Sequence, residues 1–261
     1  MEEHLFGGVA NAGKVTRYGQ FVLRPSNAHS GSIHAFLKAL RKTGFEGASL
    51  PLEIQEDGRE RLVFIEGEVP VPPYATWAQS DDVLASVTRL ISDFHRASAA
   101  VGRSMGTWNQ EMADASGGSI ICHNDICLEN VIFRDGNAVA LIDFDFAAPG
   151  RPTYDLAAFA RMCVPIDDDS SSERLGWLES DRSSRLRLVA DVYGLDAKGR
   201  IELLESLDGA IQAGGTFVLR RAKSGDTNFI QMLEGMGGME RYERRRRWWI
   251  ESREQFLAAL S

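Results

Sequence analysis

Cysteine is scarce in this sequence, and long apolar segments are missing. The three cysteines, Cys122, Cys127 and Cys163, form neither an even set nor the close spacing of a metal site, so we expect free thiols in a reducing compartment. No apolar run approaches the roughly 20 residues that a membrane-spanning helix needs. Residues 1–8 also lack the basic and apolar regions of a secretory signal. These absences predict a cytoplasmic protein with no membrane partner.

Positive charge is also in short supply. The chain has 29 lysine and arginine residues against 37 aspartate and glutamate residues, a formal net charge of −8 and a pI near 5.2. Nucleic acid is therefore not an expected partner, because its binders present basic surfaces. An acidic protein suits a cationic small-molecule substrate, but acidity that serves only solubility is an equally ordinary explanation. There are no internal repeats, and 261 residues suffice for one large domain or two lobes. The oligomeric state is left open.

What the sequence does contain is an informative stretch from Ile120 to Ala158. It opens with an apolar run, Ile120 to Cys122, that predicts a short buried strand, and it turns polar at His123. Two further apolar runs, 131–133 and 139–142, are separated by Asp135-Gly136-Asn137, which is a hairpin turn signal. The second of these runs ends directly at Asp143.

This spacing suits phosphoryl transfer. The reaction needs one carboxylate to accept the proton of the attacking hydroxyl, and oxygen ligands to hold Mg²⁺ across the nucleotide phosphates. A loop with Asp125 and Asn130, followed by a hairpin that ends in Asp143, brings three such groups together. Mg²⁺ usually relies on only one or two protein carboxylates. Asn130 and Asp143 are therefore a sufficient protein contribution to a magnesium site.

The same residues carry a family resemblance. The pattern His123-x-Asp125-x4-Asn130, followed by Ile142-Asp143-Phe144, matches the catalytic loop and metal-binding aspartate of kinases in order and spacing. With Asp155-Leu156-Ala157 downstream, the stretch resembles the aminoglycoside phosphotransferase family, a branch of the kinase-like fold that includes choline kinases. No A-P-E element ends an activation segment, so a protein kinase is disfavoured.

The resemblance implies an α+β, protein-kinase-like fold with two lobes. A small β-rich nucleotide-binding lobe would span residues 1–66, and a larger, mostly helical catalytic and substrate-binding lobe would span 67–261. A hinge is expected at about 65–70, where Leu62–Ile65 ends a strand and prolines follow.

The resemblance also implies roles for individual residues. Asp125 is the expected proton acceptor, while His123 and Asp155 support the loop that carries it. Asn130 and Asp143 are expected to hold Mg²⁺. The remaining candidates are Asp145 for the metal or substrate, Arg24 for the phosphates, and the backbone of Ile65, Glu66 and Gly67 for the base of ATP or GTP.

Two departures from the family pattern stand out in the small lobe. Arg24 ends the strand where the phosphate-binding lysine is expected, and arginine does not simply replace lysine. The predicted helix 30–43 carries no glutamate to pair with it, since no acidic residue occurs between Arg24 and Glu46. The usual ion pair is thus predicted to be missing, with His34 as the polar residue able to approach Arg24 or a phosphate. The glycine-containing segment 7–13 has no intact G-x-G-x-x-G.

We therefore expect a Mg-dependent small-molecule kinase that transfers the γ-phosphate of ATP or GTP to a hydroxyl of an aminoglycoside-like or other small substrate. The alternative is a weak or inactive nucleotide- or ligand-binding protein on the same fold. A helix is predicted at 81–100, with Asp81 as its cap, and further helices at about 171–195, 199–213 and 226–259. The acidic segment 166–173 is either one wall of a site for a cationic substrate or a solvated loop.

Overall fold

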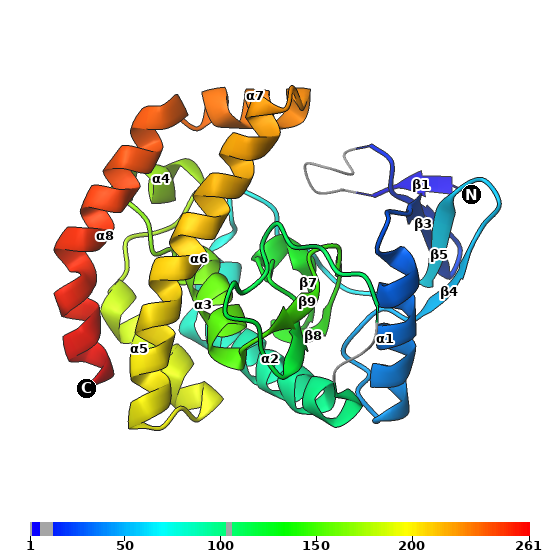
Figure 1. Cartoon of the computed structure of the whole chain (residues 1–261), viewed down its shortest axis with the longest axis horizontal. Coiled ribbons are helices and arrows are strands. Elements are labelled where there is room, and N and C mark those ends of the chain that lie inside the picture. Colours follow the sequence, from blue (N-terminus) through cyan, green and yellow to red (C-terminus); the bar gives the residue numbers. More distant parts are fainter. Residues whose placement is uncertain (1, 6–12, 103–105) are drawn as a thin grey trace.

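The structure is a computed structural model that describes residues 2–5, 13–102 and 106–261. A five-stranded antiparallel sheet with one helix forms the smaller part of the molecule, and helices with two short two-stranded sheets form the larger part. Figure 1 shows the sheet at the right and the long C-terminal helices at the left, with β7, β8 and β9 between them. The predicted α+β, kinase-like architecture is confirmed.

The small lobe is built on a sheet with the strand order β1-β2-β3-β5-β4. Its strands are β1 (Glu2–His4), β2 (Thr16–Tyr18), β3 (Phe21–Pro25), β4 (Pro51–Ile54) and β5 (Arg59–Val63). Helix α1 (Ser30–Lys42) buries an apolar stripe that includes Phe36 and Leu40, as its sequence spacing predicts. The register of β3 and β5 places Arg24 directly opposite Glu60. The glycine-containing segment predicted at 7–13 lies, except for Gly13, outside the described residues.

The chain is held against the larger lobe just after β5. The backbone N–H and C=O of Glu68 both bond to Phe133 at 2.8 Å. Gly67 has φ +151°, and a Cβ there would lie 2.4 Å from Ile132 Cγ2, so a side chain at this position would prevent the close approach. Helices η2 (Thr76–Gln79) and α2 (Asp81–Val101) follow. The predicted cap of α2 was wrong by one residue, because Ser80 Oγ accepts the bond from the Val83 N–H.

The informative stretch folds as its sequence predicts. Strand β6 (Ile120–Cys122) leads into the polar loop and helix η3 (Leu128–Asn130), and β7 (Val131–Arg134) and β8 (Asn137–Leu141) form the hairpin. Asp135 and Gly136 both have positive φ, at 51° and 73°, as a tight two-residue hairpin turn requires. Strand β9 (Ala148–Gly150) returns to pair with β6, which brings the segment after Asp143 back beside the polar loop.

Helices make up the rest of the larger lobe. They are α3 (Pro152–Cys163), α4 (Asp169–Arg174), α5 (Arg182–Tyr193), α6 (Ala197–Lys223), α7 (Thr227–Gly235) and α8 (Gly238–Leu260). One core cluster joins α1, α2, the β-hairpin, α3, α5, α6 and α8, with Phe36, Phe94 and Phe159 fully buried within it. None of the described helices is long and apolar enough to cross a lipid bilayer.

Candidate active site

Asp155 is the anchor of the polar loop. It is fully buried at the start of α3, and its carboxylate accepts hydrogen bonds from the backbone N–H of His123 at 2.8 Å and of Asn124 at 2.7 Å. The ring of His95, on α2, lies 3.0 Å from the same carboxylate. Burial would raise the pKa of Asp155, but the hydrogen bonds that its carboxylate makes with His95 and with the backbone of His123 contribute to lowering the pKa overall. Asp155 therefore stays ionised and holds the backbone of the loop at His123 and Asn124.

His123 joins this loop to the end of the hairpin. Its Nε2 lies 3.0 Å from the carbonyl oxygen of Ile142, and its ring packs on Phe144 with the centroids 4.5 Å apart. Burial lowers the pKa of His123, against the opposing effect of Asp155, so the neutral imidazole is favoured. A neutral ring that donates to a carbonyl connects the loop to the residue just before Asp143 without adding charge to the site.

The two loop residues Asp125 and Asn130 contact each other. The side-chain amide of Asn130 donates to the backbone oxygen of Asp125 at 2.8 Å and to its carboxylate at 3.3 Å. These bonds use the nitrogen of the amide, so the amide oxygen remains available as a ligand. Burial, with the charge of Asp143, raises the pKa of Asp125 to about 7. Burial and the nearby Glu129 raise the pKa of the Cys127 thiol as well, which makes Cys127 a packing residue of the loop.

Two residues of the site adopt left-handed backbone conformations. Asn124 has φ 66° and Asp143 has φ 63°, a region that asparagine and aspartate tolerate better than most residues. The side-chain amide of Asn124 donates to the Phe146 carbonyl at 2.9 Å. Unfavourable backbone geometry at both ends of one site is typical of functional positions, and the Asp143 carboxylate here accepts a hydrogen bond from Arg24.

Arg24 reaches across from the sheet to the carboxylates of the larger lobe. Its guanidinium lies 2.8 Å from Asp143 and 2.7 Å from Asp145, and its Nε donates to Glu60. Burial opposes the charged form of Arg24, but Asp143, Asp145 and Glu60 more than compensate and raise its pKa. The prediction that Arg24 lacks an ion-pair partner is therefore wrong. The partner comes from strand β5, directly opposite Arg24, instead of from helix α1.

Glu60 is the residue that the sequence-based prediction missed. It is 1% exposed, and its second oxygen lies 2.7 Å from His34 Nε2. His34 thus approaches Arg24 through Glu60. The desolvation of Glu60 is outweighed by His34 and Arg24, which lower its pKa. A signal for Glu60 was available, because it shares the buried face of its strand with Leu62 at the alternating spacing of strands.

The donor set at this end of the molecule suits Mg²⁺. Asp143, Asp145 and the free amide oxygen of Asn130 are hard oxygen ligands, and two carboxylates with phosphates and water complete the usual coordination. Within residues 2–5, 13–102 and 106–261, no cluster of three histidine, cysteine, aspartate or glutamate side chains is preformed for a metal. Arg24 bridges the two carboxylates, so a positive charge already stands where the ion would be held.

The predicted hinge segment makes contacts of its own with the rest of the chain. Glu66 pairs with Arg17 at 2.5 Å, and its carbonyl accepts a bond from Arg134 at 2.8 Å. With Glu68 bonded to Phe133, this segment is tied to both lobes. A role of Ile65, Glu66 and Gly67 in holding the base stays a prediction.

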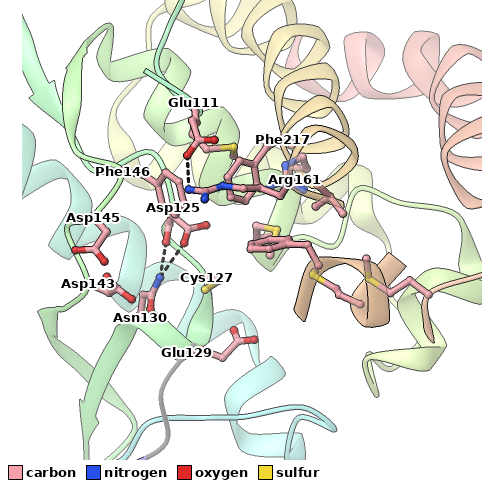
Figure 2. A pocket seen from close by; sticks show the side chains of 18 of the residues that line it. Glu111, Asp125, Cys127, Glu129, Asn130, Asp143, Asp145, Phe146, Arg161 and Phe217 are labelled. Carbon is pink, nitrogen blue, oxygen red and sulfur yellow. Dashed lines mark hydrogen bonds and ion pairs between the residues drawn. The ribbon is translucent and has the colours of Figure 1, made fainter. Parts of the chain in front are cut away.

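A cavity of about 970 Å³ connects the carboxylates with the C-terminal helices. One end, which we call the carboxylate end, consists of Asp125, Asn130, Asp143 and Asp145. The opposite side, which we call the arginine wall, consists of Arg161 from α3, Arg221 from α6, and Arg241 and Arg245 from α8. Figure 2 shows Asp143 and Asp145 on one side of Asp125 and Arg161 on the other. Ile65, Glu66 and Gly67 are not among the described residues that line this cavity.

Comparison with known proteins identifies the family to which the chain belongs. The family model described as the phosphotransferase enzyme family (APH) matches residues 103–186. The chain is also 30% identical over 208 residues to the trifolitoxin immunity protein of Rhizobium leguminosarum bv. trifolii, a match covering 74% of this chain and 75% of that protein. The chain belongs to the phosphotransferase enzyme family. The resemblance inferred from the catalytic loop is thereby confirmed.

Solved structures of phosphotransferases share the fold. A choline/ethanolamine kinase family protein from Mesorhizobium loti superposes with a TM-score of 0.66 at 15% identity, covering 100% of this chain and 92% of that one. The ternary complex of streptomycin, ATP and the phosphotransferase APH(2″)-IIa gives a TM-score of 0.52 at 13% identity, covering 88% and 90%. The family and the fold together support a kinase-like small-molecule phosphotransferase.

The acidic segment 166–173 is divided between the protein interior and the solvent: Asp167 and Asp168 are buried, whereas Asp169 and Glu173 are exposed. Asp167 lies buried between Arg241, at 3.0 Å, and Arg245, and Asp168 caps α4. Burial raises the pKa of Asp167, but Arg245 and Arg241 outweigh it and lower the pKa. The acidic residues thus neutralise arginines of the chain itself, and the cavity wall they adjoin is rich in arginine.

Proposed function

We propose that this protein transfers the γ-phosphoryl group of ATP or GTP to a hydroxyl group of a small molecule, with Mg²⁺ as cofactor. The observation that carries the proposal is the convergence of Asp125, Asn130 and Asp143 at one end of a cavity large enough for a ligand. ATP bound to a structure of the same fold supports the choice of donor.

Asp125 is the proton acceptor in this proposal. A base works best when its pKa lies near the working pH, and the pKa of Asp125 is raised to about 7. As the acceptor oxygen forms its bond to the γ-phosphorus, its proton passes to the Asp125 carboxylate. The bond between the γ-phosphorus and the bridging oxygen breaks, and its electron pair leaves with the diphosphate.

In this proposal, Arg24 and the Mg²⁺ held by its ligands neutralise the charge of the phosphates. Mg²⁺ held by Asn130 and Asp143, with Asp145 beside them, would neutralise charge on the transferred phosphoryl group. Arg24 is fixed by Glu60 through its Nε, which leaves the other two nitrogens of its guanidinium directed at the site. Those nitrogens can exchange Asp143 and Asp145 for phosphate oxygens, since arginine binds both anions with the same fork.

A second candidate function is ligand binding without turnover. The observation that favours it is the direct contact of Arg24 with both Asp143 and Asp145, because the chain itself then supplies the cation that those carboxylates need. The trifolitoxin immunity protein, to which the chain is related, is named for protection against a toxin. Protection is compatible with phosphorylation of a toxin and with its simple sequestration.

A phosphoryl-transfer assay with labelled ATP or GTP separates these two functions. Wild-type protein is incubated with Mg²⁺ and a panel of aminoglycosides, macrolides, amino alcohols and sugars, and product is compared with that of Asp125→Asn. We expect Asp125→Asn to lower the turnover number by about 10²–10⁴-fold, while nucleotide affinity, measured by calorimetry, stays within about threefold of the wild-type value.

The matched control is Asp93→Asn, an exposed aspartate on α2. It should leave turnover unchanged. Equal turnover by wild-type protein and Asp125→Asn would contradict the assignment of Asp125. Nucleotide binding without any transfer across the panel would favour the binding protein.

A further inference from the structure

One cation of the cavity has no anion to pair with. Arg161 projects from α3 into the cavity, and it makes no hydrogen bond or ion pair with any residue in the described part of the chain. Its Nε is buried without a partner. Burial, together with repulsion from Arg245, lowers the pKa of Arg161 to about 10, and the charges of Asp125 and Asp167 oppose this only in part. A half-buried guanidinium without a direct ion pair is costly unless a ligand supplies one.

The other charges on this side of the cavity do not supply the missing anion. Arg221 is bound to Glu111 at 2.6 Å, and Asp167 is shared between Arg241 and Arg245. Among the described residues, Glu111 and Asp167 thus pair directly with three of the four arginines of the arginine wall, and neither pairs directly with Arg161. Glu129 also lines the cavity, but its carboxylate accepts the hydroxyl of Tyr74 at 2.8 Å. The wall opposite Asp143 and Asp145 therefore carries an excess of positive charge.

Apolar side chains line the same cavity as Arg161. Phe217 of α6, together with Phe229 and Met232 of α7, lines the same cavity, and the two phenylalanine rings pack edge to face 5.2 Å apart. Aromatic and methionine side chains bind apolar or aromatic groups and adapt to their shape. A ligand that fills this space presents apolar surface to α6 and α7 and an anion to Arg161.

We infer that the acceptor of this phosphotransferase is an amphipathic alcohol that carries an anionic group, with the anion paired to Arg161 and the hydroxyl facing Asp125. That the hydroxyl accepts the phosphoryl group rests on the proposed function. A carboxylate and a phosphate monoester share the required chemistry, since arginine binds both through two parallel hydrogen bonds. A polycationic acceptor such as an aminoglycoside would meet repulsion at this wall, contrary to the expectation drawn from the net charge of the chain.

Four probes that differ only in their head group test this inference. They are 4-(hydroxymethyl)benzoate, 4-(hydroxymethyl)phenyl phosphate, the neutral 4-(hydroxymethyl)benzamide and the cationic 4-(aminomethyl)benzyl alcohol. Affinities are measured by calorimetry on the full chain without nucleotide, for wild-type protein, Arg161→Gln and Arg161→Lys. Arg246→Gln, at an exposed position of α8, is the matched control, and thermal unfolding confirms that each variant folds.

At least one anionic probe should bind wild-type protein tenfold or more tightly than the amide and the cationic probe. Arg161→Gln should remove that preference, Arg161→Lys should retain part of it, and Arg246→Gln should leave it intact. Preference for the carboxylate or for the phosphate identifies which anion the site takes. Equal affinities, tightest binding of the cationic probe, no binding of either anion, or an undiminished preference in Arg161→Gln would each overturn the inference.

The same probes then serve as acceptors with ATP or GTP and Mg²⁺. Anion-selective binding without transfer would count against the proposed phosphoryl transfer and leave the anion site in place. Transfer to the cationic probe alone would uphold the phosphotransferase and refute the anionic acceptor.

Discussion

The carboxylate end and the arginine wall of the cavity handle buried charge in opposite ways. At the carboxylate end, Asp143 and Asp145 face the guanidinium of Arg24, which is itself held by Glu60. At the arginine wall, Arg161 has no partner in the described part of the chain. Charged side chains that pair directly with one another can hold a site in shape without a ligand, whereas a charge without a direct pair indicates where a ligand of opposite sign is wanted. Predictions on stability can test this contrast directly.

The largest effect is expected at the support of the carboxylate end. Asp155→Ala removes a buried carboxylate that accepts the N–H groups of His123 and Asn124 and faces His95. Those donors would remain buried and unpaired, so we expect the free energy of unfolding to fall by about 3–5 kcal/mol. Urea unfolding at pH 7 measures the loss. Asp93→Ala is the control, because its pair with Arg96 is exposed and should contribute under about 0.5 kcal/mol.

A loss as small as that of Asp93→Ala would mean that the Asp155 network does not hold the loop. The carboxylate end would then lack the internal hydrogen-bonded support that distinguishes it from the arginine wall.

The same contrast explains how much the sequence could predict. The carboxylate end is local: a strand, a loop and a hairpin between Ile120 and Asp145 bring its groups together through short-range turn chemistry. Its residues were therefore found from their spacing. Glu60 was missed because its importance depends on the register of β5 against β3, which no single strand reveals.

The arginine wall is assembled from helices far apart in the chain. Arg161, Arg221 and Arg241 come from α3, α6 and α8, and only the packing of these helices decides which face of each lines the cavity. Helical periodicity predicts that a helix exists and which face is apolar, but not which arginine meets which aspartate. Residues 244–247 are four consecutive arginines, and nothing in this run shows that Arg245 binds Asp167.

Acid titration should distinguish the ion-paired part of the arginine wall, where Asp167 contacts Arg241 and Arg245, from the part without a direct ion pair, which is Arg161. The pKa of Asp167 is lowered because Arg245 and Arg241 outweigh its burial. An aspartate whose folded pKa lies below its unfolded value of about 3.9 stabilises the fold above that pH, and the stabilisation is lost as the pH falls through the folded pKa. We expect Asp167→Asn to cost about 2 kcal/mol at pH 7 and progressively less below pH 4.

Urea unfolding of Asp167→Asn and wild-type protein at pH 7, 5 and 3 provides the measurement. Asp169→Asn, at an exposed neighbour in the same acidic segment, should cost little at any of these pH values. A deficit of Asp167→Asn that stays constant down to pH 3 would show that the ion pairs with α8 are not its cause.

The smallest effect should have the opposite sign. Arg161→Met replaces a guanidinium without a direct ion pair with an apolar side chain, in a cavity that Phe217 also lines. Because the lowered pKa of Arg161 reflects a charged form that the fold disfavours, its removal should raise the free energy of unfolding by about 1 kcal/mol. Arg221→Met is the informative comparison, since it would leave Glu111 unpaired and should not stabilise. If Arg161→Met raises the free energy of unfolding and Arg221→Met does not, Arg161 is a cation that destabilises the fold. A residue that is kept although it destabilises the fold is expected to bind a ligand. A loss from Arg161→Met as large as that from Arg221→Met would show that the guanidinium has a stabilising partner, and the contrast between the two sides of the cavity would disappear.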